Sequence, residues 1–210
     1  MVVRCMATLL LSVVSFAEVV DRVAVAIDKT VIPASEIIRQ IRITALLNNE
    51  TPDFTPSARR DAADRLVDQA LIRREMQTSG YVSDPSDQGV VIYKAFRSRY
   101  PDDTAYNAAL AKYNLTDQDV KDAFQWQATF LAFVEVRFRT GITVPEDELR
   151  DYYNDQKRKN DPAIGNLSFE DARPQIEQML TQRRIDNALD RWLGQARTQT
   201  RIDYRKEAFE

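Results

Sequence analysis

The feature that most constrains the fold is the stretch from Thr116 to Gly141, which the pattern predicts to be the longest and most apolar helix of the chain. Thr116 and Asp119 have the spacing of a capping box, and Gly141 supplies a stop signal. Apolar residues occupy several adjoining rows of this helix, so one buried face does not accommodate them all. Polar residues interrupt the stretch, and a charge at the centre of a bilayer costs about 2.5–3.5 kcal/mol. We therefore expect a core helix that other helices surround.

The composition is that of a globular protein, and it excludes several classes of function. The chain has 210 residues, of which 44% are hydrophobic and 29% are charged, as in ordinary domains. Its net charge of -3 offers no basic field for nucleic acid, which is held through neutralised phosphates. No histidine is present, and Cys5 is the only cysteine. This excludes catalytic dyads and triads that use histidine, and zinc sites with nitrogen or sulfur ligands.

The sequence gives little sign of the catalytic and metal sites that need neither histidine nor cysteine. The five glycines form no phosphate-binding loop. Acid–base chemistry by carboxylates, lysine or tyrosine stays open, but no pair of acids lies in an apolar surround that would separate their pKa values. Acidic groups around Asp84, Asp102 and Asp117 lie at predicted helix starts and lack the loop of a calcium site. We therefore expect no enzyme, no bound metal and no cofactor.

The first seventeen residues have the pattern of a secretory signal peptide. Arg4 precedes a short apolar run, and Ser15 and Ala17 supply small residues for a signal peptidase. We predict cleavage after Ala17. An uncleaved anchor is the alternative, but the apolar run is shorter than the ~20 residues of a membrane span. We therefore expect no stable membrane insertion after cleavage.

The alternation after the signal predicts a strand in which Val23, Val25 and Ile27 share one face. A turn follows, Val31 and Ile32 return as a second strand, and Pro33 ends the pairing because it has no N–H. Ser35 is the expected N-cap of the next helix. Near the other end of the chain, Thr200, Ile202 and Tyr204 alternate with polar residues and predict a terminal strand.

Helical patterns fill most of the sequence between these strands. We expect helices that begin or extend at 35–47, 56–78, 85–99, 104–113, 144–153 and 168–196. Because isolated strands are marginally stable, we expect the terminal strand to pair with the N-terminal hairpin. The predicted fold is mainly α: a multi-helix core with a small β-sheet formed by the N-terminal hairpin and the C-terminal strand. Residues 18–157 form its first region, 158–167 a linker, and 168–210 a C-terminal helix and strand that pack back on the same core.

Four stretches resemble the chaperone segments of SurA-type periplasmic foldases. They are "VVDRVAVAIDKTVIPASEI", "RLVDQALIRREMQTSGYVSDPSD", "TGITVPEDELRDYYND" and "LSFEDARPQIEQMLTQRRIDNALDRWLGQARTQTRIDY". The resemblance covers nearly all of the chain after the signal. It implies a periplasmic chaperone, a holdase that binds unfolded or nascent outer-membrane proteins.

One departure from that family concerns catalysis. Its members usually carry parvulin-type prolyl isomerase domains, with active-site histidines, between the two chaperone segments. Here only the linker separates Lys157 from Ser168, and the sequence has no histidine. We therefore predict a chaperone without prolyl isomerase activity.

A holdase needs an adaptable apolar groove, for which methionine and aromatic side chains are suited. A subset of nine such residues is expected to line a groove between the central helix and its neighbours, with core packing as the alternative for each. They are Met76, Tyr93, Phe96, Tyr100, Phe124, Trp126, Phe130, Phe138 and Met179. Two other functions stay open: a scaffold of the cell envelope that binds one dedicated partner or a second copy in a homodimer, and a degenerate isomerase that acts with a catalytic partner.

Overall fold

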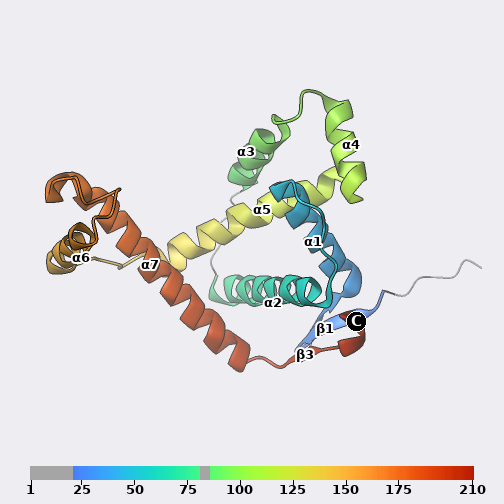
Figure 1. Ribbon diagram of the computed structural model, residues 1–210. Helices are drawn as coiled ribbons and strands as arrows, with labels where there is room; N and C mark the ends of the chain where they lie inside the picture. Colours follow the sequence, from blue (N-terminus) through green and yellow to red (C-terminus); the bar gives the residue numbers. More distant parts are fainter. Residues whose placement is uncertain (1–20, 81–85) are drawn as a thin grey trace, which may run out of the picture.

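The computed structural model describes residues 21–80 and 86–210, so the predicted signal peptide and its cleavage after Ala17 lie outside the described residues. The described chain is mainly helical with one small antiparallel sheet, which confirms the predicted fold class (Figure 1). The elements are β1 (Val23–Ile27), β2 (Thr30–Pro33), α1 (Ala34–Asn48), α2 (Pro56–Ser79), α3 (Ser86–Arg97), α4 (Asp103–Tyr113), α5 (Asp117–Val134), the π-helix η1 (Glu135–Arg139), α6 (Glu146–Arg158), α7 (Phe169–Thr198), β3 (Ile202–Tyr204) and the 3₁₀-helix η2 (Lys206–Ala208).

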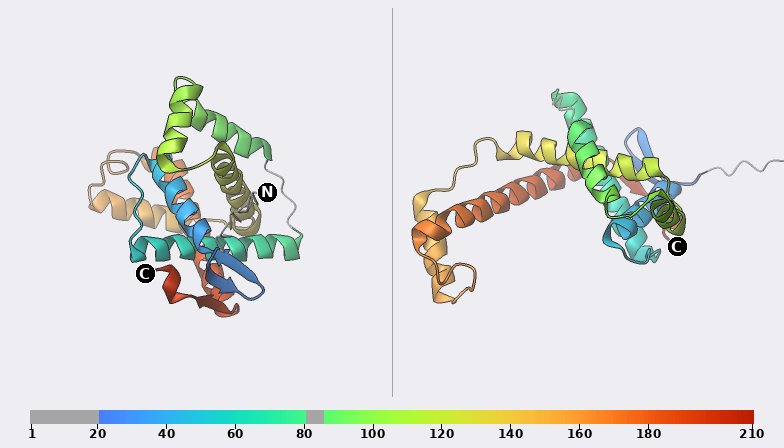
Figure 2. Two further views of the ribbon diagram at one scale, coloured as in Figure 1. Left: turned by 90° about the vertical axis from the view of Figure 1, so that its right-hand side faces the viewer. Right: turned by 90° about the horizontal axis from the view of Figure 1, so that it is seen from above.

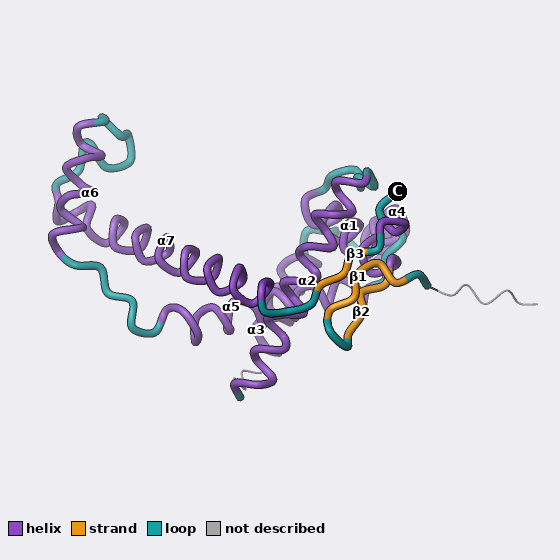
Figure 3. Tube along the Cα trace, turned by 90° about the horizontal axis from the view of Figure 1, so that it is seen from below, coloured by secondary structure: helices purple, strands orange, loops and turns teal. Residues whose placement is uncertain are grey.

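The sheet joins the two ends of the described chain, as predicted. Its order is β2-β1-β3, with both neighbours antiparallel to β1. A tight turn at Asp28, whose φ is 48°, connects β1 to β2, and Asp28 also receives a hydrogen bond of 3.2 Å from the N–H of Arg201. Figure 3 shows the three strands together at one end of the molecule, beside the C-terminus. The terminal strand therefore closes the fold onto the hairpin.

Two local expectations about this region are wrong. Val23 is exposed, whereas the adjacent Ala24 and Val25 are both buried, because the register shifts between Val23 and Val25 and a bulge redirects side chains. Ser35 is not the N-cap: α1 begins at Ala34, and both the N–H and the hydroxyl of Ser35 bind the carboxylate of Asp21.

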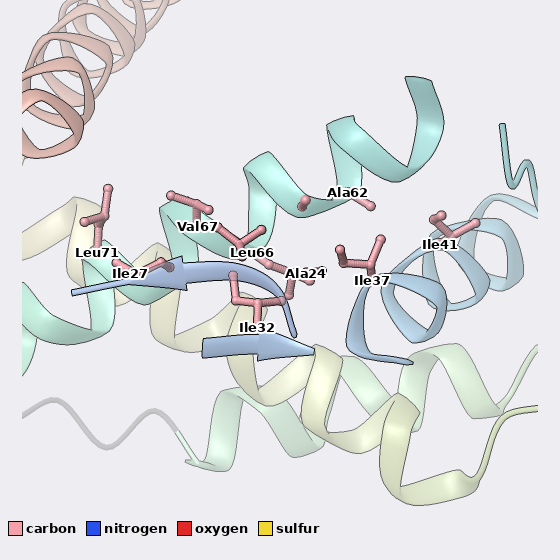
Figure 4. Close-up of a cluster of buried hydrophobic side chains, with 11 residues drawn as sticks. Ala24, Ile27, Ile32, Ile37, Ile41, Ala62, Leu66, Val67 and Leu71 are labelled. Carbon is pink, nitrogen blue, oxygen red and sulfur yellow. The ribbon is translucent and has the colours of Figure 1, made fainter. Parts of the chain in front are cut away.

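The sheet, α1 and α2 enclose the first hydrophobic core. Figure 4 shows Ala24, Ile27 and Ile32 of the hairpin facing Leu66 and Val67 of α2. A polar cluster fastens β3 to the same helices. The hydroxyl of Tyr204 donates to Asp64, and the Nε of Arg197 donates to Asp68 over 2.8 Å. The guanidinium of Arg60 lies 3.5 Å from the centre of the Tyr204 ring.

The predicted central helix is shorter than expected. Its start is confirmed, since Thr116 and Asp119 form a reciprocal capping box. The α-helix ends at Val134, however, and continues as a π-helix to Arg139 before Gly141 adopts a φ of 88°. The longest helix is instead α7, with 30 residues against 18 in α5. The expectation of one α-helix from Thr116 to Gly141 is therefore wrong after Val134, where the π-helix replaces it.

The two halves of α5 bury opposite faces. Phe124 packs in a core with α1, α3 and α4, whereas Phe133 packs in a core with α2, η1 and α7. These residues are nine positions apart, which is about two and a half helical turns. Leu131 continues the face of the first half and is 51% exposed. Apolar residues occur on most sides of this helix because its first half buries one face and its second half buries the opposite face. The prediction that other helices surround it along its whole length is therefore wrong.

The helix α7 changes its buried face in the same way. Ile176 packs against α6, and Ile185, again nine positions later, packs against Ile72 of α2 and Phe138 of η1. Consequently α6 and the first half of α7 lie to one side of the remaining helices. Figure 2 shows this part projecting away from the other helices, and we refer to residues 146–180 as the arm. Because the arm's core shares no residue with the other cores, it is a separate packing unit.

The residues expected to form a linker are a short loop at the tip of the arm. Ile164 in this loop is buried with Leu149 and Ile176. The main-chain N–H groups of Ile164 and Gly165 donate hydrogen bonds to Asp161. The hydroxyl of Ser168 caps the start of α7. The loop is thus part of the arm's packed core.

Candidate binding surfaces

The nine residues predicted to line a groove lie in three separate cores. Phe96 and Phe124 are buried where α3, α4 and α5 meet, and Tyr93 and Tyr100 pack partly exposed against them. The ring centres of Phe96 and Phe124 are 5.3 Å apart. Phe138 is buried in the second core of α5, where three partly buried residues accompany it: Met76, Trp126 and Phe130.

Met179 is separate from the other eight residues because it lies on the arm. Its sulfur accepts a hydrogen bond of 2.9 Å from the hydroxyl of Tyr152, and it lines a hollow of about 480 Å³ along the first half of α7. Burial of Phe96, Phe124 and Phe138 leaves little of their rings for a ligand. Four of the nine predicted residues keep partly exposed rings, namely Tyr93, Tyr100, Trp126 and Phe130, and of these Tyr93 and Trp126 line hollows on two sides of α5.

A hydrogen-bonded cluster orients Tyr93 between α3 and α5. The hydroxyls of Tyr93 and Tyr106 donate to one oxygen of Asp117 over 2.5 and 2.8 Å, and Lys121 lies 2.6 Å from the other oxygen. Burial and the contact with Asp117 raise the pKa of both tyrosines. Burial acts to raise the pKa of Asp117, but the hydrogen bonds from Lys121 and the tyrosines outweigh it and lower that pKa. Both phenols therefore stay neutral at physiological pH, and their hydrogen bonds to Asp117 hold the Tyr93 ring in place.

Next to this cluster, α3 and α5 form a shallow hollow of about 300 Å³. Val90, Tyr93 and the stems of Lys94 and Lys121 line it. Val90 is 47% exposed and Val91 is 65% exposed, although the sequence pattern allowed for their burial in α3. The sequence carried no clear signal of this exposure, because adjacent apolar residues of a helix can share one core, as Leu66 and Val67 of α2 do.

A second hollow, of about 210 Å³, lies where α1, α2 and α5 surround a common space. The three helices form a triangle in Figure 1. Trp126 lies in its wall, and the guanidinium of Arg73 stacks 4.5 Å from the centre of the Trp126 ring. Gln40, Gln69 and Gln127 contribute one amide from each helix. Sequence analysis missed these residues because they come from three segments with no shared motif.

Within residues 21–80 and 86–210, no three residues of the types Asp, Glu, Cys and His gather as metal ligands would. Asp102 and Asp119 instead accept hydrogen bonds at the starts of α4 and α5. Of the helices in the same ranges, none combines the length and the apolar character of a membrane span.

Comparison with known proteins assigns no family to the chain. Neither the models of known protein families nor the curated proteins contain a match to it.

Proposed function

We propose that the protein is a periplasmic chaperone, a holdase that binds unfolded outer-membrane or other envelope proteins. The observation that carries the proposal is the hollow between α3 and α5, beside the exposed Val90 and Val91. An exposed apolar surface on a soluble protein commonly marks an interaction site. Here the apolar groups are accompanied by the stem of Lys94, which can adapt to different side chains, and by that of Lys121, whose ammonium group is paired with Asp117.

The resemblance to SurA-type chaperone segments supports the same proposal. So does the division of the described chain into several small cores with shallow hollows between helices. General acid–base catalysis works best with a group that titrates near the working pH, whereas here the pKa of Tyr93 and Tyr106 is raised and that of Asp117 is lowered. In the tyrosine cluster, the two phenols and Asp117 hold one another in their neutral and charged forms, respectively.

The test is suppression of aggregation, followed by light scattering, with an unfolded outer-membrane β-barrel protein as the client. Replacement of Val90 and Val91 by serine removes exposed apolar surface without opening a cavity, so the fold is retained. We expect this variant to lose most of its suppression at a concentration where the unaltered protein protects fully. The matched control is Val31→Ser, because Val31 is 57% exposed on β2, away from the hollow. Equal suppression by both variants would place client binding elsewhere.

We further propose that the protein has no prolyl isomerase activity of its own. The basis is the absence of histidine from the whole sequence and the short loop at the tip of the arm, where relatives of SurA type carry an inserted domain. A protease-coupled assay with a proline peptide checks this, and catalysis above the uncatalysed rate refutes it. A scaffold for one dedicated partner would be distinguished by tight binding to a single folded protein.

A further inference from the structure

The hollow between α1, α2 and α5 contains polar groups that the protein does not use. Within the described residues, the side-chain amides of Gln40, Gln69 and Gln127 and the guanidinium of Arg73 make no hydrogen bond. Gln40 and Gln69 are half-buried and Gln127 is exposed, and each amide offers both a donor and an acceptor. Three amides with no partner in the described part of the protein thus line one hollow from three helices, where a ligand with donors and acceptors can replace the water that they bind.

The charges of this hollow argue against an anionic ligand. Its other arginine, Arg39, binds Glu36 and Asp119, the latter over 3.0 Å. Asp122 also lines the hollow and accepts a hydrogen bond of 2.7 Å from Gln118. Two arginines therefore face three carboxylates, and no excess of positive charge is left for a carboxylate or phosphate. A neutral ligand with both donors and acceptors fits this balance.

We infer that this hollow binds the main-chain peptide groups of an extended polypeptide, an inference that rests on the proposed function and adds a second contact for the client. A peptide group carries one N–H donor and one carbonyl acceptor, which is the same pair that a glutamine amide presents. Trp126, covered on one side by Arg73, offers an aromatic wall for whichever side chain follows. The contact depends on the main chain, so it is independent of client sequence.

The same chemistry separates unfolded from folded proteins. In a folded protein nearly all buried peptide groups are already paired in helices, sheets or turns, so they are not free for the glutamine amides. An unfolded chain presents its peptide groups to water and can exchange them. The hollow therefore selects for lack of structure, whereas the apolar surface at Val90 and Val91 selects for hydrophobic side chains.

The test compares two fluorescent peptides of identical side chains, capped at both ends and about ten residues long, the length of one barrel strand. One peptide has an ordinary main chain, and the other is N-methylated at alternate positions, which removes donors. We expect the unaltered protein to bind the N-methylated peptide more weakly, by about fivefold in Kd for each hydrogen bond lost. This factor corresponds to the usual net contribution of one hydrogen bond to a binding free energy. Equal affinity of the two peptides overturns the inference without any variant having to fold.

The Gln69→Leu/Gln127→Leu variant adds an independent check. It should bind the ordinary peptide at least about tenfold more weakly and should distinguish the two peptides less strongly, since only Gln40 of the three amides remains. The matched control is Gln77→Leu/Gln88→Leu, which removes two exposed glutamines of α2 and α3 outside the hollow and should behave like the unaltered protein. Unchanged discrimination in the hollow variant contradicts the inference.

Two further results distinguish this inference from the proposed function. If the unaltered protein suppresses aggregation while the hollow variant does so equally well, the inference fails and the proposed function stands. If the unaltered protein suppresses no aggregation, the proposed function fails. A concentration-dependent dimer that the hollow variant abolishes would identify a second copy of the chain as the occupant and would also overturn the inference.

Discussion

Replacement of Ile176 by alanine should open the arm and leave the remainder of the fold intact. Ile176 is 0% exposed and packs with Leu149, Ile164 and Leu180. The substitution removes three carbon atoms, which at ~0.8 kcal/mol per buried methylene amounts to about 2.4 kcal/mol. The cavity left behind raises the loss to about 3–4 kcal/mol, within the range observed for such truncations. The population of the opened arm then rises by roughly two to three orders of magnitude.

Native-state hydrogen exchange measures this effect element by element. Amides of α6 and of the first half of α7 should lose protection in the Ile176→Ala variant, while those of β1 and α2 keep theirs. The control is Ile37→Ala, a truncation of a residue that is 1% exposed in the core beneath the sheet. It should lower protection in β1 and α2 instead. If Ile176→Ala lowers the protection of β1 as much as that of α6, the arm is not a separate packing unit.

Three further predictions concern the polar contacts. Thr116→Ala removes the cap of α5 and should lower the unfolding free energy by about 1 kcal/mol, with Thr116→Ser retaining most of it in thermal unfolding. Burial opposes ionisation of Asp119, but hydrogen bonds from Thr116 and Arg39 outweigh it and lower its pKa. Its stabilisation is therefore present above the unfolded-state pKa near 4 and is lost as the pH falls through the lower folded-state value. Asp119→Asn should flatten the acid side of the stability profile, and an unchanged profile would contradict this. Tyr204→Phe loses the hydrogen bond to Asp64 and should cost about 1 kcal/mol in urea unfolding.

Much of the fold could be predicted because its signals are local. The spacing of Thr116 and Asp119 marks a capping box by itself, and the position of Gly80 after α2 marks a helix end, where it adopts a φ of 66°. The alternation at Ile202 and Tyr204 likewise identifies a strand. That strand's pairing with β1 followed from the marginal stability of an isolated hairpin.

The features that were not predicted depend on which core each face of a helix packs against. The sequence shows which residues of α5 are apolar, and their spacing shows on which side of the helix each lies. Neither shows that Phe124 and Phe133 pack in different cores. The same ambiguity hid the change of face between Ile176 and Ile185 in α7, and with it the arm. The glutamine hollow was missed for a related reason. Its amides carry no pattern within any one helix and acquire a common position only when three helices meet.

The measurement that tests the proposed chaperone function most directly is the affinity of the protein for the same β-barrel protein in its unfolded and folded forms. Anisotropy titrations with a labelled client, freshly diluted from urea or folded in detergent micelles, supply both values. A second, unrelated barrel protein tests whether binding is general. A holdase should bind both unfolded clients and neither folded form. Tight binding to one folded partner, or no binding to either unfolded client, would contradict it.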